Sequence, residues 1–192
     1  LLSERGESLE AVQAGETALA QDRRLDDHDA TVRLTCHLAT ALCRLGRAAD
    51  AATRLLPLRH WVDTQGDDEL RMLWHGDWAA TLGHLGRLRE AVAAYDEARL
   101  AARRSGSADA EGRLMMNCAV TLRQGGQFDR ALALSRQGRV LSAGDPGDSS
   151  HRLIADLVVA RDEAEAGCFA SALATLELTL PGFEQSGAGF WS

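Results

Sequence analysis

Lysine is absent from this sequence of 192 residues, so arginine supplies all 21 basic side chains. The 28 acidic residues outnumber them, and the formal net charge is −7. A chain with this balance is not built to attract phosphate backbones. We therefore expect no direct nucleic-acid partner, and we attribute the arginine bias to a GC-rich genome.

The sequence also lacks the patterns that hold metals or carry out chemistry. Its four cysteines form no Cys-x-x-Cys pair and no histidine–cysteine ligand spacing, which excludes a disulfide framework and a zinc knuckle. Cys36 and Cys43 are seven residues apart, roughly 10 Å along a helix, which is too far for a disulfide. We interpret both as small packing residues rather than redox sensors. No glycine-rich phosphate loop or nucleophile–base arrangement is present, so we predict no enzyme, no cofactor and no metal.

No apolar run approaches the roughly 18 residues that a membrane span needs, and no signal peptide is recognisable. We therefore predict a cytoplasmic protein without a membrane partner. The chain begins at Leu1 without a methionine, and we expect it to be a piece of a longer protein. Only three prolines and 45% hydrophobic residues predict one all-α domain over residues 1–192.

The spacing of the glycines indicates a sequence repeat of about 40 residues. Turn glycines are expected 40, 40, 40 and 41 residues apart, at Gly6, Gly46, Gly86, Gly126 and Gly167. An alanine follows each glycine by five residues, at Ala11, Ala51, Ala91, Ala131 and Ala172. Halfway between the glycines, further breaks carry Asp or Ser residues suited to cap a helix.

These turn glycines and capping residues predict alternating helices. The expected ranges are 7–22, 28–44, 47–64, 67–85, 87–105, 107–125, 127–143, 149–166 and 169–186. Pro57 should kink the helix expected at 47–64. No single unit of this kind can bury its apolar stripe alone, so neighbouring units must stack.

Residues 86–98 read Gly-Arg-Leu-Arg-Glu-Ala-Val-Ala-Ala-Tyr-Asp-Glu-Ala. They resemble the tetratricopeptide half-motif Gly-x-Tyr/Phe-x-x-Ala-x-x-x-Tyr/Phe-x-x-Ala, and residues 126–131 and 115–122 resemble further parts of it. The resemblance implies a right-handed α-α superhelix, an α-solenoid of antiparallel helix pairs, that binds proteins. The 40-residue period, in place of the usual 34, resembles the sensor and effector regions of bacterial transcription activators of the MalT/LuxR and AfsR-like groups.

In such arrays the resemblance places the first helix of each pair along the groove. Gly76, Ala80 and Gly83 would lie within about 60° of one another on the helix expected at 67–85. Each mid-helix glycine costs roughly 1 kcal/mol relative to alanine. Something should compensate for that cost, either a ligand backbone against the bare stripe or close packing by a neighbouring helix or a second copy. Trp78 is expected in the core, and Trp74 either covers a helix joint or anchors a partner.

Asn117 matches an asparagine that, in many members of the family, hydrogen-bonds the backbone of a bound peptide. The alternative is an intramolecular bond, for example to Asp77, which lies 40 residues earlier. Arg113 and Arg123 are expected on the same helix, where they would meet acidic groups of a partner or remain solvated.

These expectations favour a non-catalytic interaction domain from the sensor or scaffold region of a bacterial signalling or transcription-regulatory protein. Its partner would be a protein or peptide segment, or a small effector, and a second copy of the chain is a further candidate. The alternative is a structural dimerisation scaffold without a groove ligand.

Overall fold

A computed structural model describes residues 2–22, 27–142 and 149–186. Every regular element in these ranges is a helix, and the helices pack as sequential antiparallel pairs. The prediction of an all-α fold of the tetratricopeptide-like solenoid type is confirmed. The chain divides into two compact units, residues 1–105 and 106–192.

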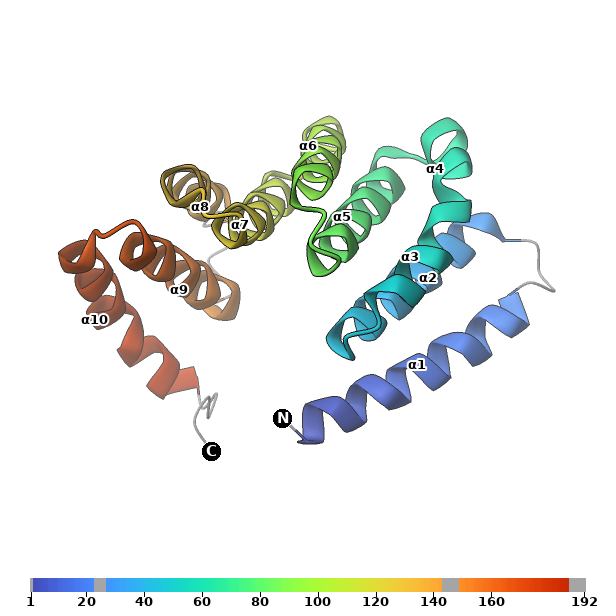
Figure 1. Cartoon of the computed structure of the whole chain (residues 1–192), viewed down its shortest axis with the longest axis horizontal. Coiled ribbons are helices and arrows are strands. Elements are labelled where there is room, and N and C mark those ends of the chain that lie inside the picture. The colour runs from blue at the N-terminus through green and yellow to red at the C-terminus, as the bar shows by residue number, and fades with distance from the viewer. Residues whose placement is uncertain (1, 23–26, 143–148, 187–192) are drawn as a thin grey trace. The chain divides into compact units, whose positions relative to one another are not determined.

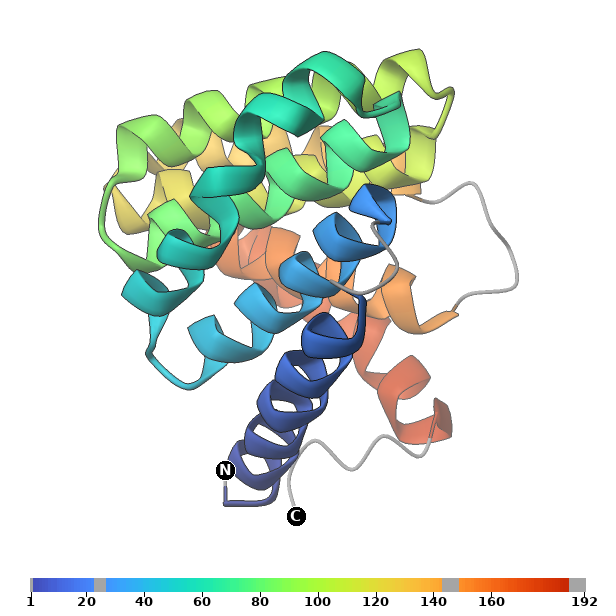
Figure 2. The same ribbon diagram turned by 90° about the vertical axis from the view of Figure 1, so that its right-hand side faces the viewer.

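The first unit begins with a helix that packs against the first complete pair, and a second pair follows (Figure 1). In chain order its elements are α1 (Leu2–Asp22), α2 (His28–Arg44), α3 (Ala48–Leu55), the 3₁₀ helix η1 (Leu56–Leu58), α4 (Arg59–Gln65), α5 (Asp68–His84) and α6 (Leu88–Arg104). Figure 2 shows α1 and α2, in dark and lighter blue, side by side. Helices α2 and α5 are the first helices of their pairs.

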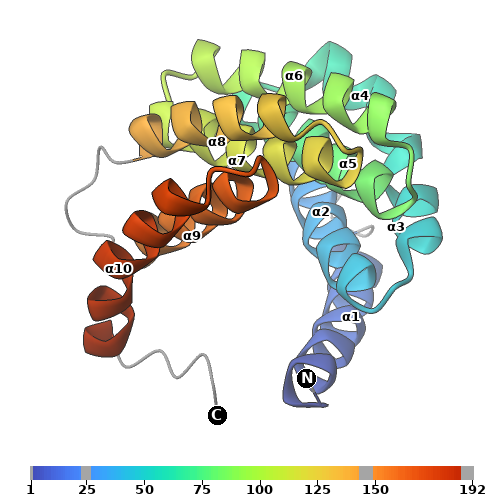
Figure 3. The same ribbon diagram turned by 60° about the vertical axis from the view of Figure 1, so that its left-hand side comes forward.

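The second unit contains two pairs, α7 (Ala108–Gln124) with α8 (Phe128–Ser142), and α9 (Ser149–Glu165) with α10 (Phe169–Ser186). Figure 3 shows α9 and α10 lying against each other as an antiparallel hairpin. Helices α7 and α9 are the first helices here. In both units the boundaries agree with the predicted ranges to within a residue or two, except at α1.

The turn glycines explain this agreement. Gly46, Gly86, Gly126 and Gly167 all have φ between +71° and +79°, a conformation that glycine adopts without the steric cost of a Cβ atom. At the other end of α2, α5 and α7, the predicted caps form. Asp67 Oδ1 accepts a hydrogen bond from Leu70 N at 2.8 Å, which satisfies one of the free N–H groups of the first turn of α5.

Two features differ from a uniform repeat. Gly6 was predicted to lie in a turn, which is wrong, because α1 runs through it from Leu2 to Asp22. The surrounding residues favour a helix, and one internal glycine costs only about 1 kcal/mol. Pro57 divides the helix expected at 47–64 into α3, η1 and α4, as predicted, because proline lacks the N–H group that the helix interior requires.

The repeated alanines of the second helices are buried. Ala51, Ala91 and Ala131 have no exposed surface, and Ala172 is 5% exposed. Ala11, at the same position in α1, is exposed.

Candidate functional site: the exposed faces of the first helices

One face of each first helix remains open. It consists of the residues 13, 9 and 6 positions before the turn glycine, and all of them are at least partly exposed. We call these residues the first-helix face. They are Arg33, His37 and Thr40 in α2; Leu73, Asp77 and Ala80 in α5; Arg113, Asn117 and Val120 in α7; and Ile154, Val158 and Arg161 in α9.

Asp77 is the acidic residue of this face in the first unit. Thr40 Oγ1 donates a hydrogen bond to Asp77 Oδ1 at 3.0 Å. Burial raises the pKa of Asp77 to about 6, although hydrogen bonds from Thr40 and Cys36 act in the opposite direction. Asp77 thus connects α5 to α2 while remaining partly exposed.

The predicted bare stripe is also partly open, since Gly76, Ala80 and Gly83 all retain some exposure. The residues at the same repeat position in other first helices show a second possible role for Gly76. Ten residues before the turn glycine, α2 has Cys36 and α7 has Met116, and both are buried. The position of Gly76 therefore serves helix packing in other pairs, and both interpretations of the stripe stay open.

The cysteines of α2 are packing residues. Burial raises the pKa of the Cys36 thiol and that of the Cys43 thiol. Cys43 Sγ lies 3.6 Å from Thr81 Oγ1 on α5. A buried thiol with a raised pKa is rarely ionised, which argues against redox reactivity.

The tryptophans of α5 belong to the core. Trp78 is 9% exposed, so the prediction that it lies in the core is confirmed. Trp74 has no exposed surface and donates from Nε1 to the carbonyl oxygen of Leu55 at 3.2 Å. The two indole rings stack with their centroids 5.7 Å apart. Trp74 therefore covers the joint between α3 and α5 and offers no anchor to a partner.

In the second unit, the exposed face of α7 carries Asn117 and Arg113. Asn117 is exposed, and its side chain has no hydrogen-bond partner among the described residues of this unit. Arg113 is exposed and forms an ion pair with Asp109 on the preceding turn. Asn117 can thus offer both an amide donor and a carbonyl acceptor to a peptide bond.

Arg123 points inward instead. Its side chain is 10% exposed, and Nη1 lies 3.5 Å from Oδ1 of the fully buried Asp162 on α9. Burial raises the pKa of Asp162, while Ser135 and Arg123 lower it. Arg123 was expected to meet acidic groups of a partner or to remain solvated; instead it pairs with an acid inside the unit, which leaves little of its guanidinium for a partner.

Glu163 is a second buried acid in this unit, and the sequence analysis did not single it out. The sequence carried a signal, because Glu163 interrupts a series of leucines, Leu42, Leu82 and Leu122, at the same repeat position. Its carboxylate accepts hydrogen bonds from Arg136 Nη2 at 2.7 Å, Ser171 Oγ at 2.7 Å and Thr175 Oγ1 at 3.0 Å. Burial alone would raise the pKa of Glu163, but these donors together lower it.

Two features relevant to other functions can be reported for the described ranges. They contain no group of three or more His, Cys, Asp or Glu side chains placed to hold a metal ion. None of the helices in the same ranges is both long and apolar enough to cross a membrane.

Comparison with known families identifies the repeat. One family model described as tetratricopeptide repeat matches residues 3–103, and another matches residues 69–139. The chain belongs to the tetratricopeptide repeat family. Domains of this family generally bind proteins or peptides and are typically non-catalytic. No curated protein sequence matches the chain.

Solved structures share the fold at low sequence identity. A protein from Podosopora anserina described as a kinesin light chain with nearly identical TPR-like repeats is 18% identical, with a TM-score of 0.73; the alignment covers 94% of this chain and 89% of that one. A signal transduction ATPase with numerous domains from Pyrococcus horikoshii, which has a tetratricopeptide repeat sensor, is 14% identical. Its TM-score is 0.76, and the alignment covers 94% of this chain and 29% of that one.

Proposed function

We propose that this tetratricopeptide repeat chain binds a protein or peptide segment along its first-helix faces. The observation that carries the proposal is Asn117, an exposed amide without a partner among the described residues of its unit, at the centre of one such face. Its register equivalents, His37, Asp77 and Val158, are also at least partly exposed. Within each unit, the two first helices carry chemically different side chains at this repeat position, which suits recognition of an extended segment.

We further propose that the chain is the sensor or scaffold region of a bacterial signalling or transcription-regulatory protein in the cytoplasm. Two observations support this narrower assignment. The 40-residue period resembles that of bacterial activators of the MalT/LuxR and AfsR-like groups. The structural neighbour from Pyrococcus horikoshii is a signal transduction ATPase in which a tetratricopeptide repeat region is the sensor.

Selection from a random peptide library displayed on phage tests the binding proposal without a known partner. Enriched peptides should bind the wild-type chain and lose about fivefold or more in affinity with Asn117→Ala, since one hydrogen-bonded contact is worth about 1 kcal/mol or more. Gly83→Leu should weaken them by placing a bulky side chain beside the α5 face. Gln137→Ala, an exposed change on the second helix α8, is the matched control.

The alternative is a dimerisation scaffold in which the Gly76/Gly83 stripe packs against a second copy. It is favoured by the burial of Cys36 and Met116, which stand at the position of Gly76 in other helices. Sedimentation velocity separates the two functions. A concentration-dependent dimer that Gly83→Leu disrupts, together with no enriched peptide, would support the scaffold and overturn the peptide proposal.

A further inference from the structure

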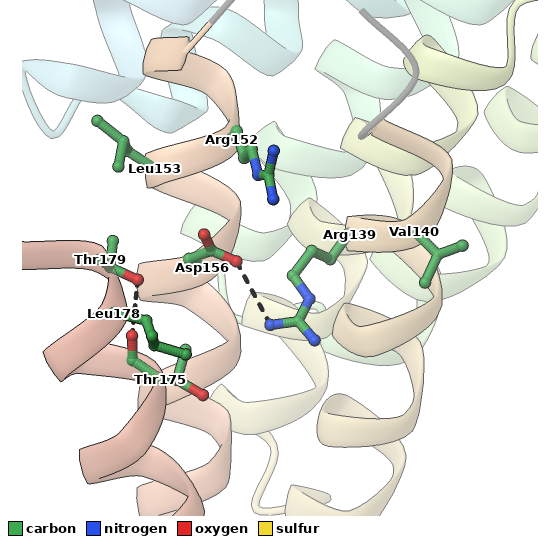
Figure 4. Close-up of a pocket in the computed structure, with 8 residues that line it drawn as sticks. All are labelled: Arg139, Val140, Arg152, Leu153, Asp156, Thr175, Leu178 and Thr179. Atoms are coloured by element: carbon green, nitrogen blue, oxygen red, sulfur yellow. Dashed lines mark hydrogen bonds and ion pairs between the residues drawn. The ribbon is translucent and has the colours of Figure 1, made fainter. Parts of the chain in front are cut away.

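Each unit has a hollow where a first helix lies between two second helices. In the first unit, the α4–α6 hollow has a volume of about 490 Å³ and is lined by Asp63, Asp68, Arg71, His75, Glu97 and Arg104. In the second unit, the α8–α10 hollow has a volume of about 670 Å³ and includes Arg139, Arg152, Asp156, Thr175 and Leu178 (Figure 4).

These hollows occupy the same repeat positions. Both use residues 15 and 11 positions before the turn glycine and 11 positions after it. The occupants are Arg71, His75 and Glu97 in the α4–α6 hollow, and Arg152, Asp156 and Leu178 in the α8–α10 hollow. A difference in their chemistry therefore reflects the side chains and not a different place in the repeat.

Both arginines of the α4–α6 hollow are paired with an acid inside it. Arg71 donates from Nε to Val62 O at 3.3 Å and from Nη2 to Asp63 O at 3.2 Å, so it caps the end of α4. Its Nη1 lies 3.7 Å from Asp68 Oδ1, and Asp68 also pairs with Arg104 at 2.8 Å. Among the described residues that line this hollow, no arginine is left unpaired for a ligand.

The α8–α10 hollow has a different balance of charged side chains. Arg139 Nη1 lies 3.3 Å from Asp156 Oδ1, the carboxylate that Figure 4 shows between α8 and α9. Arg152 is exposed, and no ion-pair partner for it is found in the part of the chain that the structure describes. Leu178, 84% exposed, replaces the carboxylate of Glu97. An unneutralised guanidinium thus lines the same hollow as the apolar side chains of Leu153 and Leu178.

We propose that the α8–α10 hollow binds a small organic anion, a carboxylate or phosphate group carried on an apolar chain. Arg152 and Arg139 hold the anionic group by charge-assisted hydrogen bonds, and Leu153 and Leu178 cover the apolar chain. The volume of about 670 Å³ falls within the range of about 300–1,000 Å³ typical of small-molecule sites. This site is separate from the first-helix faces and does not depend on the peptide proposal.

The test is an NMR titration of the ¹⁵N-labelled chain with sodium octanoate, which has a carboxylate and an apolar chain. Saturable amide shifts are expected around residues 139–140, 152–156 and 175–179. Inorganic phosphate and 1-octanol, which each lack one half of the chemistry, should bind at least about tenfold more weakly. If octanol binds as well as octanoate, the anion-binding proposal is overturned. Octyl phosphate, compared with octanoate, distinguishes the two anionic head groups.

Three variants localise the site. Arg152→Ala should weaken octanoate at least about tenfold, and Leu178→Glu, which copies Glu97 of the other hollow, should abolish saturable binding. Arg130→Ala removes the same charge from an exposed position of α8 outside the hollow and should leave the affinity unchanged. Equal losses for Arg152→Ala and Arg130→Ala, or wild-type affinity in Leu178→Glu, would overturn the proposal. Circular dichroism melting checks that each variant is folded.

Discussion

The two units make different contacts at the same place between successive first helices. The two positions are three residues before one turn glycine and five residues before the next. In the first unit they are occupied by Cys43 and Thr81, whose neutral side chains lie 3.6 Å apart. The second unit puts Arg123 and Asp162 at these positions, 3.5 Å apart and almost completely buried. The repeat therefore determines which positions meet, and the side chains determine the energy of the contact.

The largest effect is expected from Arg123→Ala. It leaves the carboxylate of Asp162 buried without its counter-charge, and breaking a buried pair in this way costs roughly 3–5 kcal/mol. Cys43→Ala, at the same position in the first unit, removes only a neutral contact and should cost about 1 kcal/mol. Urea denaturation of both variants measures the difference. Equal losses of unfolding free energy would show that the charge of the pair does not add to the cost of breaking the contact.

The exchange Arg123→Cys with Asp162→Thr sharpens this comparison, because it transfers the neutral pair of the first unit into the second. It should recover most of the stability lost in Arg123→Ala, since no buried charge remains. A double variant as unstable as Arg123→Ala in the same urea experiment would mean that the loss comes from packing volume.

A smaller effect, which depends on pH, is expected at Asp77. Its pKa of about 6 in the folded chain lies above the ordinary value of 3.8, so the folded state binds more protons between these values. Stability should therefore fall as pH rises from about 4 to 6, by at most about 3 kcal/mol. Asp77→Asn, which copies Asn117 of the second unit, should remove this slope and raise stability at pH 7.

The measurement is the urea midpoint of the wild type and Asp77→Asn at pH 4.5 and pH 7. Asn117→Asp is the reverse change at an exposed position and should leave the wild-type pH dependence almost unchanged. An Asp77→Asn variant that keeps the wild-type slope would contradict the assignment of the titration to this carboxyl group.

The smallest effects concern the helix caps. Asp67 Oδ1 accepts from Leu70 N at 2.8 Å in the first unit, whereas Ser107 Oγ lies 3.4 Å from Ala110 N in the second. Asp67→Ala should cost about 1 kcal/mol and Ser107→Ala less, because the longer bond is weaker. Thermal unfolding with both variants checks the order, and the reverse order would contradict it.

Most of the fold could be predicted from the sequence because its signals are local. Gly86 and Gly126 adopt positive φ, and Asp67 caps the helix that follows it, so single residues determine where these helices begin and end. The exception was Gly6, where a glycine that resembles a turn lies inside α1. The residues around it favour a helix, and a local pattern does not show which tendency prevails.

The candidate site was only partly predictable. The position of Asn117 on an open face followed from its place in the repeat. The inward orientation of Arg123 did not, because Asp162 lies 39 residues away and belongs to no motif. The α8–α10 hollow was missed for the same reason. Its chemistry depends on the absence of a carboxylate at Leu178, which becomes visible only when the two hollows are superposed by register.

The most direct test of the account is where a selected peptide lies. An enriched phage peptide titrated into the ¹⁵N-labelled chain should shift the amides of the first-helix faces, with the side-chain amide of Asn117 among the largest changes. Within a unit, the two first helices should respond together, while exposed residues of the second helices α6 and α8 should change little. Shifts confined to the second helices α6, α8 and α10, with Asn117 unaffected, would contradict peptide binding at the first-helix faces.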